Sequence, residues 1–423
     1  MNQPINADTR IRQQHCTPAV YGDCELHSEF QPIISPTHRR VIGLEGLTRP
    51  SRHGRQLSPG TLFTRAAQEG EEPALDLALW QQFLQIYARA DPNAWLFLNL
   101  SAASVGDPRT SPEALAELVH NEGLSCSRIV LEIVEDAIRN QEVLEEFVAE
   151  CRDHGFRVAI DDFGAGDAHF ERIWRIKPDI VKMDRTMAVQ AAKKPSASRI
   201  LMSLIRMIRE NGSLVLLEGL ETLEQAALAW HSDADFYQGF WYSRPAPLIE
   251  NGCASAENSL GIAERRFAAL SEQQEQRQIQ TLQLLRHEVL ATCNHIAKGI
   301  SLAEATKPLF ECDGVKRCYL LDIRGIQRGE TVMTNGHAAT IPDFNPLDHA
   351  EGASWSHREY FKSALSKPGE IHLSRPYVAL PDTARTITIS HMTYTSDTHL
   401  ILCLDIHPEE AFPGSDHQLP NQL

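Results

Sequence analysis

Residues 157–164 read RVAIDDFG, a short apolar run that ends on two adjacent aspartates, Asp161 and Asp162, followed by Phe163 and a glycine. Apolar runs of this length are typical of strands that are buried on both faces of a parallel sheet. In a closed barrel of parallel strands, catalytic groups project from the carboxyl ends of the strands. The stretch therefore predicts a buried strand that presents two acidic side chains at a candidate site.

Apolar runs of the same kind recur on both sides of this stretch, with amphipathic segments between most of them. One such segment, residues 197–212, ends on Gly212, and glycine is a frequent helix stop. Eight strands, most of them separated by a helix, predict an α/β fold, a TIM-like (β/α)8 barrel over residues 22–250. A doubly wound open sheet is the alternative, although no glycine-rich first turn of the dinucleotide-binding type favours it. The eight runs are FQPIIS (30–35), VIGLEGLTR (41–49), WLFLNLS (95–101), IVLEIVE (129–135), RVAIDDFG (157–164), DIVKMD (179–184), LVLLEGLE (214–221) and FYQGFWY (236–242).

Polar side chains close these runs, one strand after another. A single carboxylate after a strand is usually a turn or helix cap, but independent capping is a poor account of eight polar residues on consecutive strands. Because the carboxyl ends of parallel strands meet at one end of a barrel, we expect these side chains to converge on its mouth. The residues are Glu45, Asn99, Glu132, Asp161, Asp162, Lys182, Glu218 and Gln238.

Five carboxylates at one mouth predict a metal site. Crowded like charges destabilise one another unless a cation compensates them, and oxygen ligands with one amide favour the hard cations Mg²⁺ or Mn²⁺. The adjacent pair Asp161 and Asp162 suits two ions, because one carboxylate can bridge them. Two ions about 3.5–4 Å apart promote in-line attack of hydroxide on a phosphodiester. Lys182 can then orient the attacking water or help to deprotonate it.

Composition sets further limits. The 423 residues include 42% hydrophobic ones, which is enough apolar material to exclude global disorder. The net charge of -16 argues against a general nucleic-acid or anionic-membrane binder, although bound metals would supply the positive field that a phosphate needs. Nine scattered cysteines without a CxxC motif favour reduced thiols. Neither a membrane-spanning run nor a signal peptide is recognisable, so we expect a cytoplasmic protein without a membrane span.

Taken in order, the motifs at these strand ends resemble those of the EAL-domain phosphodiesterases, which open cyclic di-GMP to linear pGpG. The resemblance covers residues 22–250, just over half of the chain. Each motif alone is weak, but the whole series in order and on strands is highly specific. The motifs are Glu45-Gly46-Leu47 followed by Arg49, Asn99-Leu100-Ser101, Glu132-Ile133-Val134-Glu135, Asp161-Asp162-Phe163-Gly164-Ala165-Gly166, Lys182-Met183-Asp184, Glu218-Gly219-Leu220-Glu221-Thr222, and Gln238-Gly239-Phe240 with Ser243-Arg244-Pro245.

The resemblance implies a role for each matching position. It places Lys182 and Gln238 at the nucleophilic water and the hydration shell of the second metal, and Glu135 as an anchor for the loop after Asp162. It makes Gln31, Leu47 and Arg49 substrate contacts, with Arg49 on a non-scissile phosphate; a strand-end turn and a surface cation are the alternatives for Gln31 and Arg49. Asp184, Glu221 and Arg244 are further base or supporting contacts. The implied ligands of two Mg²⁺ or Mn²⁺ ions are Glu45, Asn99, Glu132, Asp161, Asp162 and Glu218.

Two departures from the family pattern stand out. Gly46 replaces the usual alanine, which removes one methyl group that we expect beside the substrate, and we expect the change to be tolerated. Asp167 stands where the family usually has an aromatic residue, and His169 and Phe170 replace a small residue and a leucine. This loop commonly joins the metal sites to a dimer interface, so Asp167 bears on how the loop packs.

A second region follows the barrel. Residues 251–300 predict a linker helix, and residues 301–412 predict a small α+β domain with antiparallel strands at 315–325, 369–380, 384–394 and 399–406. Residues 1–21 form an N-terminal extension and 413–423 a disordered tail. The small domain resembles Cache/PAS-type sensors through Arg358-Glu359-Tyr360-Phe361, Ser374-Arg375-Pro376-Tyr377 and the strand Thr386–Ser390. This resemblance implies a pocket near Arg358 and Tyr377 for an unknown small-molecule or protein ligand; packing without a ligand is the alternative.

The leading hypothesis is a metal-dependent enzyme, a cyclic-guanylate-specific phosphodiesterase that the C-terminal domain regulates through the linker helix. The alternative is a catalytically silent cyclic di-GMP receptor, for which Asp167 is the only support, because every ligand carboxylate is kept. A protein–protein adaptor that binds no nucleotide is a third hypothesis. The family pattern and the leucine-bearing linker also predict a homodimer.

Overall fold

The computed structural model describes residues 18–134, 140–165, 170–334, 350–380, 383–395 and 398–413. The chain divides into two compact units, Met1–Ala268 and Ala269–Leu423. One helix, α10 (Ile249–Ala297), begins in the first unit and ends in the second. The domain limits that we expect from the sequence, 22–250, 251–300 and 301–412, remain a prediction.

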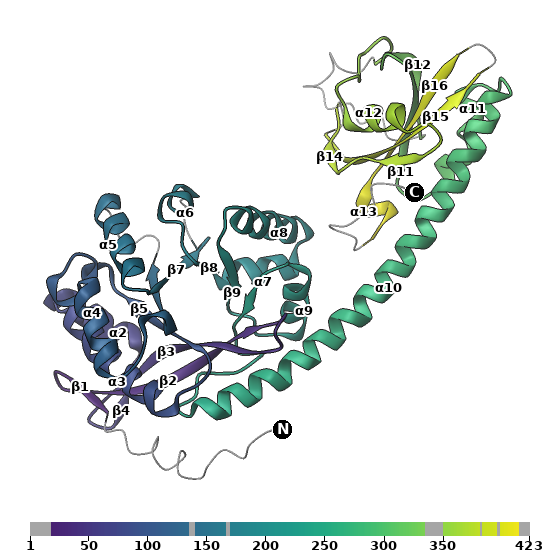
Figure 1. Cartoon of the computed structure of the whole chain (residues 1–423). Coiled ribbons are helices and arrows are strands. Elements are labelled where there is room, and N and C mark those ends of the chain that lie inside the picture. Colours follow the sequence, from purple (N-terminus) through teal and green to yellow (C-terminus); the bar gives the residue numbers. More distant parts are fainter. Residues whose placement is uncertain are drawn as a thin grey trace. The chain divides into compact units, whose positions relative to one another are not determined.

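The described strands of the first unit belong to a single sheet that closes on itself (Figure 1). Their bounds are β1 (Ala19–Tyr21), β2 (Cys24–Ser35), β3 (Arg40–Arg52), β4 (Arg55–Gln56), β5 (Trp95–Leu100), β6 (Ile129–Val134), β7 (Arg157–Phe163), β8 (Ile180–Met183), β9 (Leu214–Leu217) and β10 (Phe236–Tyr237). Eight of them form the barrel in the order β2-β3-β5-β6-β7-β8-β9-β10, and β10 pairs back onto β2. The predicted TIM-like α/β barrel is therefore confirmed.

Strand β2 differs from the prediction, because it runs antiparallel to both β3 and β10. Strands β3 and β5 to β10 are parallel to one another. Only residues 36–39 join β2 to β3, and a parallel crossover needs a dozen residues or more. The expectation that residues 30–35 form a parallel strand is therefore wrong, and the barrel opens with a hairpin instead.

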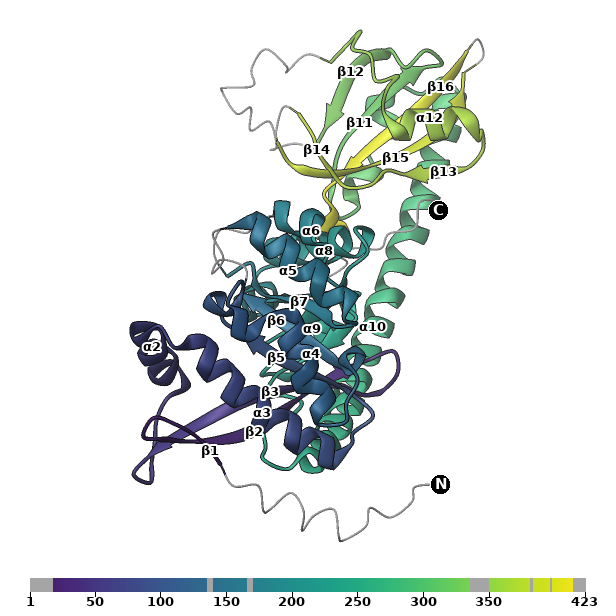
Figure 2. The ribbon, with the colours of Figure 1, turned by 60° about the vertical axis from the view of Figure 1, so that its left-hand side comes forward.

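Helices flank the barrel strands on the outside (Figure 2). They are α2 (Pro59–Glu69), α3 (Glu72–Ala90), α4 (Pro112–Asn121), α5 (Gln141–Asp153), α6 (Phe170–Ile176), α7 (Arg185–Lys193), α8 (Pro195–Glu210) and α9 (Leu223–His231), with short 3-10 turns η1 (Ala102–Ser104), η2 (Pro108–Thr110) and η3 (Cys126–Arg128). Side-chain caps fix where several of them begin: Ser58, Ser111 and Asn140 each accept a hydrogen bond from a backbone amide in the first turn.

The barrel interior is filled in layers. One layer is entirely apolar and consists of Ile33, Phe97, Val130, Ala159, Ile180, Leu216 and Phe236. Gly43 leaves room for this layer, because a Cβ at that position would lie 2.5 Å from the ring of Phe97. Side chains of a strand alternate between its two faces, so the residue two positions further along each strand also points inward. Those residues include Asn99, Glu132 and Asp161, which places a polar layer directly beyond the apolar one.

The second unit is built on an antiparallel sheet of order β12-β11-β16-β15-β13, with β14 paired to β15. Its strands are β11 (Val315–Asp322), β12 (Gln327–Met333), β13 (Ile371–Leu373), β14 (Tyr377–Val378), β15 (Arg385–Tyr394) and β16 (His399–Ile406). Its helices besides α10 are α11 (Leu302–Ala305), α12 (Glu359–Ser366) and α13 (Pro408–Ala411), with the 3-10 turn η5 (Leu309–Glu311). Strand β12 has no counterpart in the prediction.

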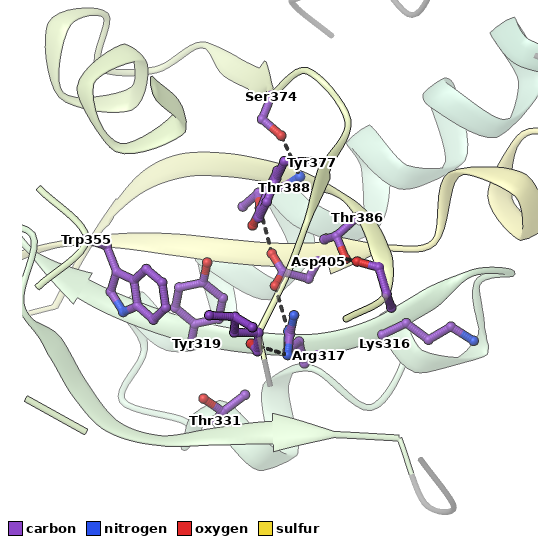
Figure 3. Close-up of polar contacts among 12 residues, drawn as sticks. Lys316, Arg317, Tyr319, Thr331, Trp355, Ser374, Tyr377, Thr386, Thr388 and Asp405 are labelled. Atoms are coloured by element: carbon purple, nitrogen blue, oxygen red, sulfur yellow. Dashed lines mark hydrogen bonds and ion pairs between the residues drawn. The ribbon is translucent and has the colours of Figure 1, made fainter. Parts of the chain in front are cut away.

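The two faces of this sheet are chemically different. One face is apolar and shares a core with the last part of α10, through side chains such as Leu285 and Val289. The other face carries a smaller apolar cluster that includes Tyr319 and Ile401. Beside it lie buried polar side chains at directly paired positions: Arg317, Asp405 and Thr388 on β11, β16 and β15. Figure 3 shows these side chains joined by hydrogen bonds.

Within the part of the chain that the structure describes, no helix is both long and apolar enough to span a bilayer. The eight described cysteines are all unbridged.

Candidate active site

The polar layer lies at the end of the barrel where the parallel strands finish. Glu132 and Asp161 come from β6 and β7, Lys182 from β8, and Glu218 and Gln238 directly follow β9 and β10. Glu45 lies inside β3 rather than at its end, because β3 continues to Arg52 in the hairpin with β2. The pairing of β3 with β5 nevertheless stops at Glu45, so this residue marks where β3 leaves the barrel.

Lys182 is the hub of this layer. Its side chain is 1% exposed, and its Nζ atom lies 2.5 Å from Glu132, 2.8 Å from Glu218 and 3.0 Å from Asp161. Glu45 is slightly further away, at 3.7 Å. One ammonium group thus opposes four carboxylates.

Two amide side chains fix the orientation of Glu45. Gln238 Nε2 donates to Glu45 Oε2 at 2.6 Å, and Asn99 Nδ2 donates to Glu45 Oε1 at 3.3 Å. The indole of Trp80 on α3 donates to the backbone oxygen of Asn99, which holds the end of β5 in place. Both oxygens of Glu45 are therefore held in fixed positions.

Asp162 joins the cluster through its backbone conformation. Its φ of 57° lies in the left-handed region, which aspartate tolerates better than most residues. Oxygens of Asp161, Asp162 and Glu218 lie within 4.8 Å of one another. The adjacent pair predicted from the sequence therefore does share one site, together with Glu218, which directly follows β9.

The carboxylates differ in how readily they ionise. Burial raises the pKa of Glu132 well above its usual value and that of Glu218 to about 8, with Lys182 opposing the shift and neighbouring carboxylates adding to it. Burial also raises the pKa of Asp162, and the Asp161 charge adds to the effect. Burial opposes ionisation of Glu45 as well, but Lys182 and the two amide donors outweigh it and lower the pKa. Four carboxylates keep the pKa of Lys182 well above normal despite its burial.

The donor set fits divalent cations. Glu132 Oε2 and Gln238 Oε1 are buried and accept no hydrogen bond, and such acceptors call for a donor or a cation. Among the described lysines and arginines, Lys182 alone is paired with these carboxylates, so negative charge is in excess. Every ligand atom offered is an oxygen, which matches Mg²⁺ or Mn²⁺.

The hairpin of β2 and β3 presents the predicted substrate contacts. Gln31 lies directly opposite Glu45, and Leu47 and Arg49 follow on the same face of β3. Gln31 donates to the backbone oxygen of Ser243 at 3.2 Å. Arg49 pairs with Glu29 at 2.7 Å, and both side chains are about one quarter exposed. Glu29 was missed from the sequence; only its spacing of two residues from Gln31 pointed to it.

The remaining predicted site residues lie on loops and have partners of their own. Asp184 caps α7 through the amide of Thr186, and Glu221 pairs with Arg185 at 2.8 Å. The guanidinium of Arg244 lies 4.4 Å from the ring centroid of Phe240. Among the described residues, no hydrogen bond or ion pair joins these three side chains to the carboxylate cluster, although the charge of Asp184 adds to the raised pKa of Asp162.

Four positions singled out in the sequence lie outside the described residues: Glu135, Gly166, Asp167 and His169. Gly46 is described, and a Cβ there would meet the ring of Phe83 on α3 at 3.0 Å. Position 46 therefore faces the helix outside the barrel, and the expectation that the missing methyl lies beside the substrate is wrong.

The model of the EAL domain matches residues 17–245, more than half of the chain. The chain belongs to the EAL-domain family. The matched segment contains every residue of the carboxylate cluster. The EAL domain is therefore the barrel unit, and the sequence motifs that resemble the family lie at the mouth of this barrel.

The alignments with relatives of this EAL-domain protein cover different shares of each relative. The uncharacterized EAL-domain containing protein YkuI of Bacillus subtilis is 25% identical over 391 residues, which cover 89% of this chain and 93% of YkuI. The cyclic di-GMP phosphodiesterase NbdA of Pseudomonas aeruginosa is 26% identical over 251 residues, 58% of this chain and 32% of NbdA. Other matching relatives, such as the probable cyclic di-GMP phosphodiesterase PdeB of Escherichia coli, are also spanned over less than half of their length.

A solved structure resembles both units of the chain. The crystal structure of Bacillus subtilis YkuI, in complex with substrate c-di-GMP and calcium, superposes with a TM-score of 0.75 at 22% identity. It covers 93% of this chain and 97% of the YkuI chain. At this identity the likeness establishes the shared fold, including that of the second unit.

Proposed function

We propose that this EAL-domain protein hydrolyses cyclic di-GMP to linear pGpG with two bound Mg²⁺ or Mn²⁺ ions. The observation that carries the proposal is the convergence of Glu45, Glu132, Asp161 and Glu218 on Lys182, with Asp162 alongside. The ligands of the two ions would be these five carboxylates and Asn99. Relatives named as cyclic di-GMP phosphodiesterases support the choice of substrate.

In the reaction, water adds to one of the two phosphodiesters, the bond from phosphorus to the 3′-oxygen breaks, and that oxygen takes up a proton. Bound divalent ions would polarise the phosphate and acidify the attacking water. The role of the chain is to hold the reacting groups in fixed positions. Lys182 is fully buried, so its ammonium group is held in a fixed position from which it can orient the attacking water, and Gln238 fixes Glu45 beside it.

Substrate binding would use the inward face of the β2–β3 hairpin. Arg49 is held by Glu29 but remains partly exposed, so its guanidinium can form a bidentate pair with the phosphate that is not cleaved. Gln31 and Leu47 lie on the same face and can contact a guanine base. Arg49→Gln should therefore raise the KM by about tenfold or more, since a charged hydrogen bond contributes about 1.5–3 kcal/mol, while leaving kcat nearly unchanged.

The decisive experiment is product analysis of the purified chain with cyclic di-GMP, with and without Mn²⁺ or Mg²⁺. Metal-dependent formation of pGpG supports the proposal, and Asp161→Asn should abolish it while leaving some nucleotide binding. Asp153→Asn is the matched control, because Asp153 is exposed at the end of α5. Tight binding without turnover would instead make the protein a cyclic di-GMP receptor.

We also propose that the second unit is a sensor for a small ligand, acting on the barrel through α10. Its support is a buried polar group on one sheet face: Arg317 and Asp405, with side chains 8% and 4% exposed, pair at 2.7 Å, and Thr388 donates to Asp405 at 2.7 Å. A buried ion pair in place of apolar packing adds little stability, which favours a role in binding. Arg358 lies over the ring of Tyr377 at 5.4 Å, and its buried Nε donates no hydrogen bond.

Thermal-shift measurements with small carboxylates and free amino acids test the sensor proposal. A compound that raises the melting temperature should lose its effect in Arg358→Gln and keep it in Arg375→Gln, a change at an exposed arginine of the same unit. Equal loss in both variants, or no shift with any compound, would count against a pocket at Arg358.

Two further expectations remain proposals. A homodimer predicts that sedimentation at micromolar concentration shows a species of twice the chain mass, and a single-chain species alone would contradict it.

Cytoplasmic localisation is supported by the eight unbridged cysteines, and fractionation of cells that express the tagged chain would test it.

A further inference from the structure

A cavity of about 960 Å³ lies at the end of the barrel opposite the carboxylate cluster. Its walls come from the points where the parallel strands begin: Trp95, Leu214 and Phe236 are the first residues of β5, β9 and β10, and Ile42 lies near the start of β3. The apolar layer around Phe97 and Leu216, both 0% exposed, separates this cavity from the mouth. The cavity is therefore not an extension of the proposed active site.

The cavity combines aromatic and cationic side chains. Trp95 is half-buried, and its ring meets that of Phe236 edge to face, with centroids 6.2 Å apart. Arg128 is paired with Asp91 at 2.8 Å, and Arg209 lies 3.5 Å from Asp235, so the charges of these two arginines are already compensated.

Arg40 is the exception among the cavity's arginines. It is exposed at the start of β3, and its side chain has no ion pair or hydrogen bond to any residue in the described ranges. One uncompensated guanidinium beside an aromatic wall suits a flat ring with an attached anion. Guanidinium pairs with phosphate in bidentate geometry, and a base stacked on an aromatic side chain gains about 1–3 kcal/mol.

We propose that this cavity binds a nucleoside monophosphate, with its base against Trp95 and Phe236 and its phosphate paired with Arg40. The volume lies within the range of about 300–1,000 Å³ that small-molecule sites occupy. Strands β5 and β10 lead from these two aromatic residues to Asn99 and Gln238, which hold Glu45. If the proposed function holds, a ligand in the cavity is placed to change the geometry of the mouth.

Isothermal titration calorimetry of the full chain with AMP, and with adenosine as the ligand that lacks the phosphate, tests the proposal. AMP should bind saturably and adenosine about tenfold more weakly, because the charged pair with Arg40 is lost. In Arg40→Gln, the affinity for AMP should fall to that for adenosine, and the affinity for adenosine should stay the same. Arg55→Gln is the matched control, since Arg55 is exposed on β4 and lines no part of the cavity.

Three outcomes would overturn the proposal: no saturation by AMP below about 1 mM, an Arg40→Gln variant that binds AMP like the unmodified chain, or displacement of AMP by cyclic di-GMP, which would place AMP in the mouth. Asp161→Asn should keep AMP binding intact. A chain that binds AMP in this way but hydrolyses no cyclic di-GMP would therefore contradict the proposed function and not the cavity.

Discussion

At the scale of single residues, the ammonium group of Lys182 opposes the mutual repulsion of the buried carboxylates. Its removal would leave Glu45, Glu132, Asp161 and Glu218 without a cation at a site where Glu132 is fully buried and the other three are at most 19% exposed. Losing one partner of a buried ion pair destabilises a protein by about 3–5 kcal/mol. We therefore expect Lys182→Met to lower the free energy of unfolding of the metal-free barrel by that amount, measured by urea denaturation in the presence of a chelator.

The same variant has a pH signature. Glu132 and Glu218 have raised pKa values, so lowering the pH protonates them in the folded state and relieves the repulsion. The loss of stability in Lys182→Met should therefore be larger at pH 8 than at pH 6. The control is Lys193→Met, which changes an exposed lysine in the last turn of α7 and should leave the urea midpoint unchanged. Equal midpoints for Lys182→Met and the unmodified chain would show that Lys182 does not neutralise the cluster.

Gly46 allows a second test at this scale. The EAL family usually has alanine at this position. In Gly46→Ala the added Cβ would lie 3.0 Å from the ring of Phe83, which packs edge to face with Phe30. Because overpacking of a core costs about 1–3 kcal/mol, we expect Gly46→Ala to lower the melting temperature of the barrel while leaving the KM for cyclic di-GMP unchanged. Gly60→Ala, where a Cβ would meet nothing within 4 Å, is the control. An altered KM with unchanged stability would place position 46 at the substrate after all.

At the scale of elements, α9 shows how a cap positions the active site. The helix begins directly after the segment that carries Glu218, and Thr222 and Gln225 form a reciprocal capping box. Gln225 Oε1 also accepts from the amide of Glu221 at 2.7 Å. Loss of such a cap costs about 1 kcal/mol, so Thr222→Ala should lower the urea midpoint of the barrel accordingly. Thr64→Ala, at an exposed position inside α2, should not; equal losses in both variants would contradict a capping role.

The strands also show how much of the fold could be predicted from the sequence. The parallel strands were predictable because each is a compact apolar run closed by a polar residue, and this pattern also located the eight residues of the cluster. The direction of β2 was not predictable from its composition, since a buried antiparallel strand can be as apolar as a parallel one; the short 36–39 connection was the available signal. Because the hairpin was missed, so was the pairing of Glu29 with Arg49.

The contacts of loop residues were the least predictable from the sequence, and the roles expected for these residues at the substrate stay predictions. Asp184 and Glu221 were assigned from motifs that continue past a strand, and the structure shows local roles for them, as a helix cap and as the partner of Arg185. Local hydrogen bonds of this kind cannot be predicted from the spacing of apolar residues in the sequence. Positions on a strand, and those directly after one such as Glu218 and Gln238, follow from the pleat, whereas the contacts of side chains further along a loop do not.

At the scale of the whole molecule, α10 contributes to two separate cores. Leu260 and Ala263 belong to the core of the barrel unit, and Leu285 belongs to that of the second unit. Truncating a fully buried leucine costs about 3 kcal/mol or more. Calorimetry of Leu285→Ala should therefore show a lower transition for the second unit and an unchanged one for the barrel. The adjacent Leu284 is 51% exposed, and Leu284→Ala should change neither; a shift of both transitions in Leu285→Ala would mean that the units unfold together.

Metal binding should raise the thermal stability of the barrel unit alone. The oxygen cluster lies within the barrel, so Mn²⁺ that binds the folded barrel and not the unfolded chain stabilises it by about 2.7 kcal/mol at a concentration 100 times its dissociation constant. We expect Mn²⁺ to raise only the barrel transition in calorimetry, and Asp161→Asn to remove most of the shift, because Asp161 contributes to the oxygen cluster with Asp162 and Glu218. The excess of carboxylates over the single Lys182 predicts a larger shift at low ionic strength, where charge is less screened. A shift of the second unit, or an undiminished shift in Asp161→Asn, would place the bound metal elsewhere in the chain.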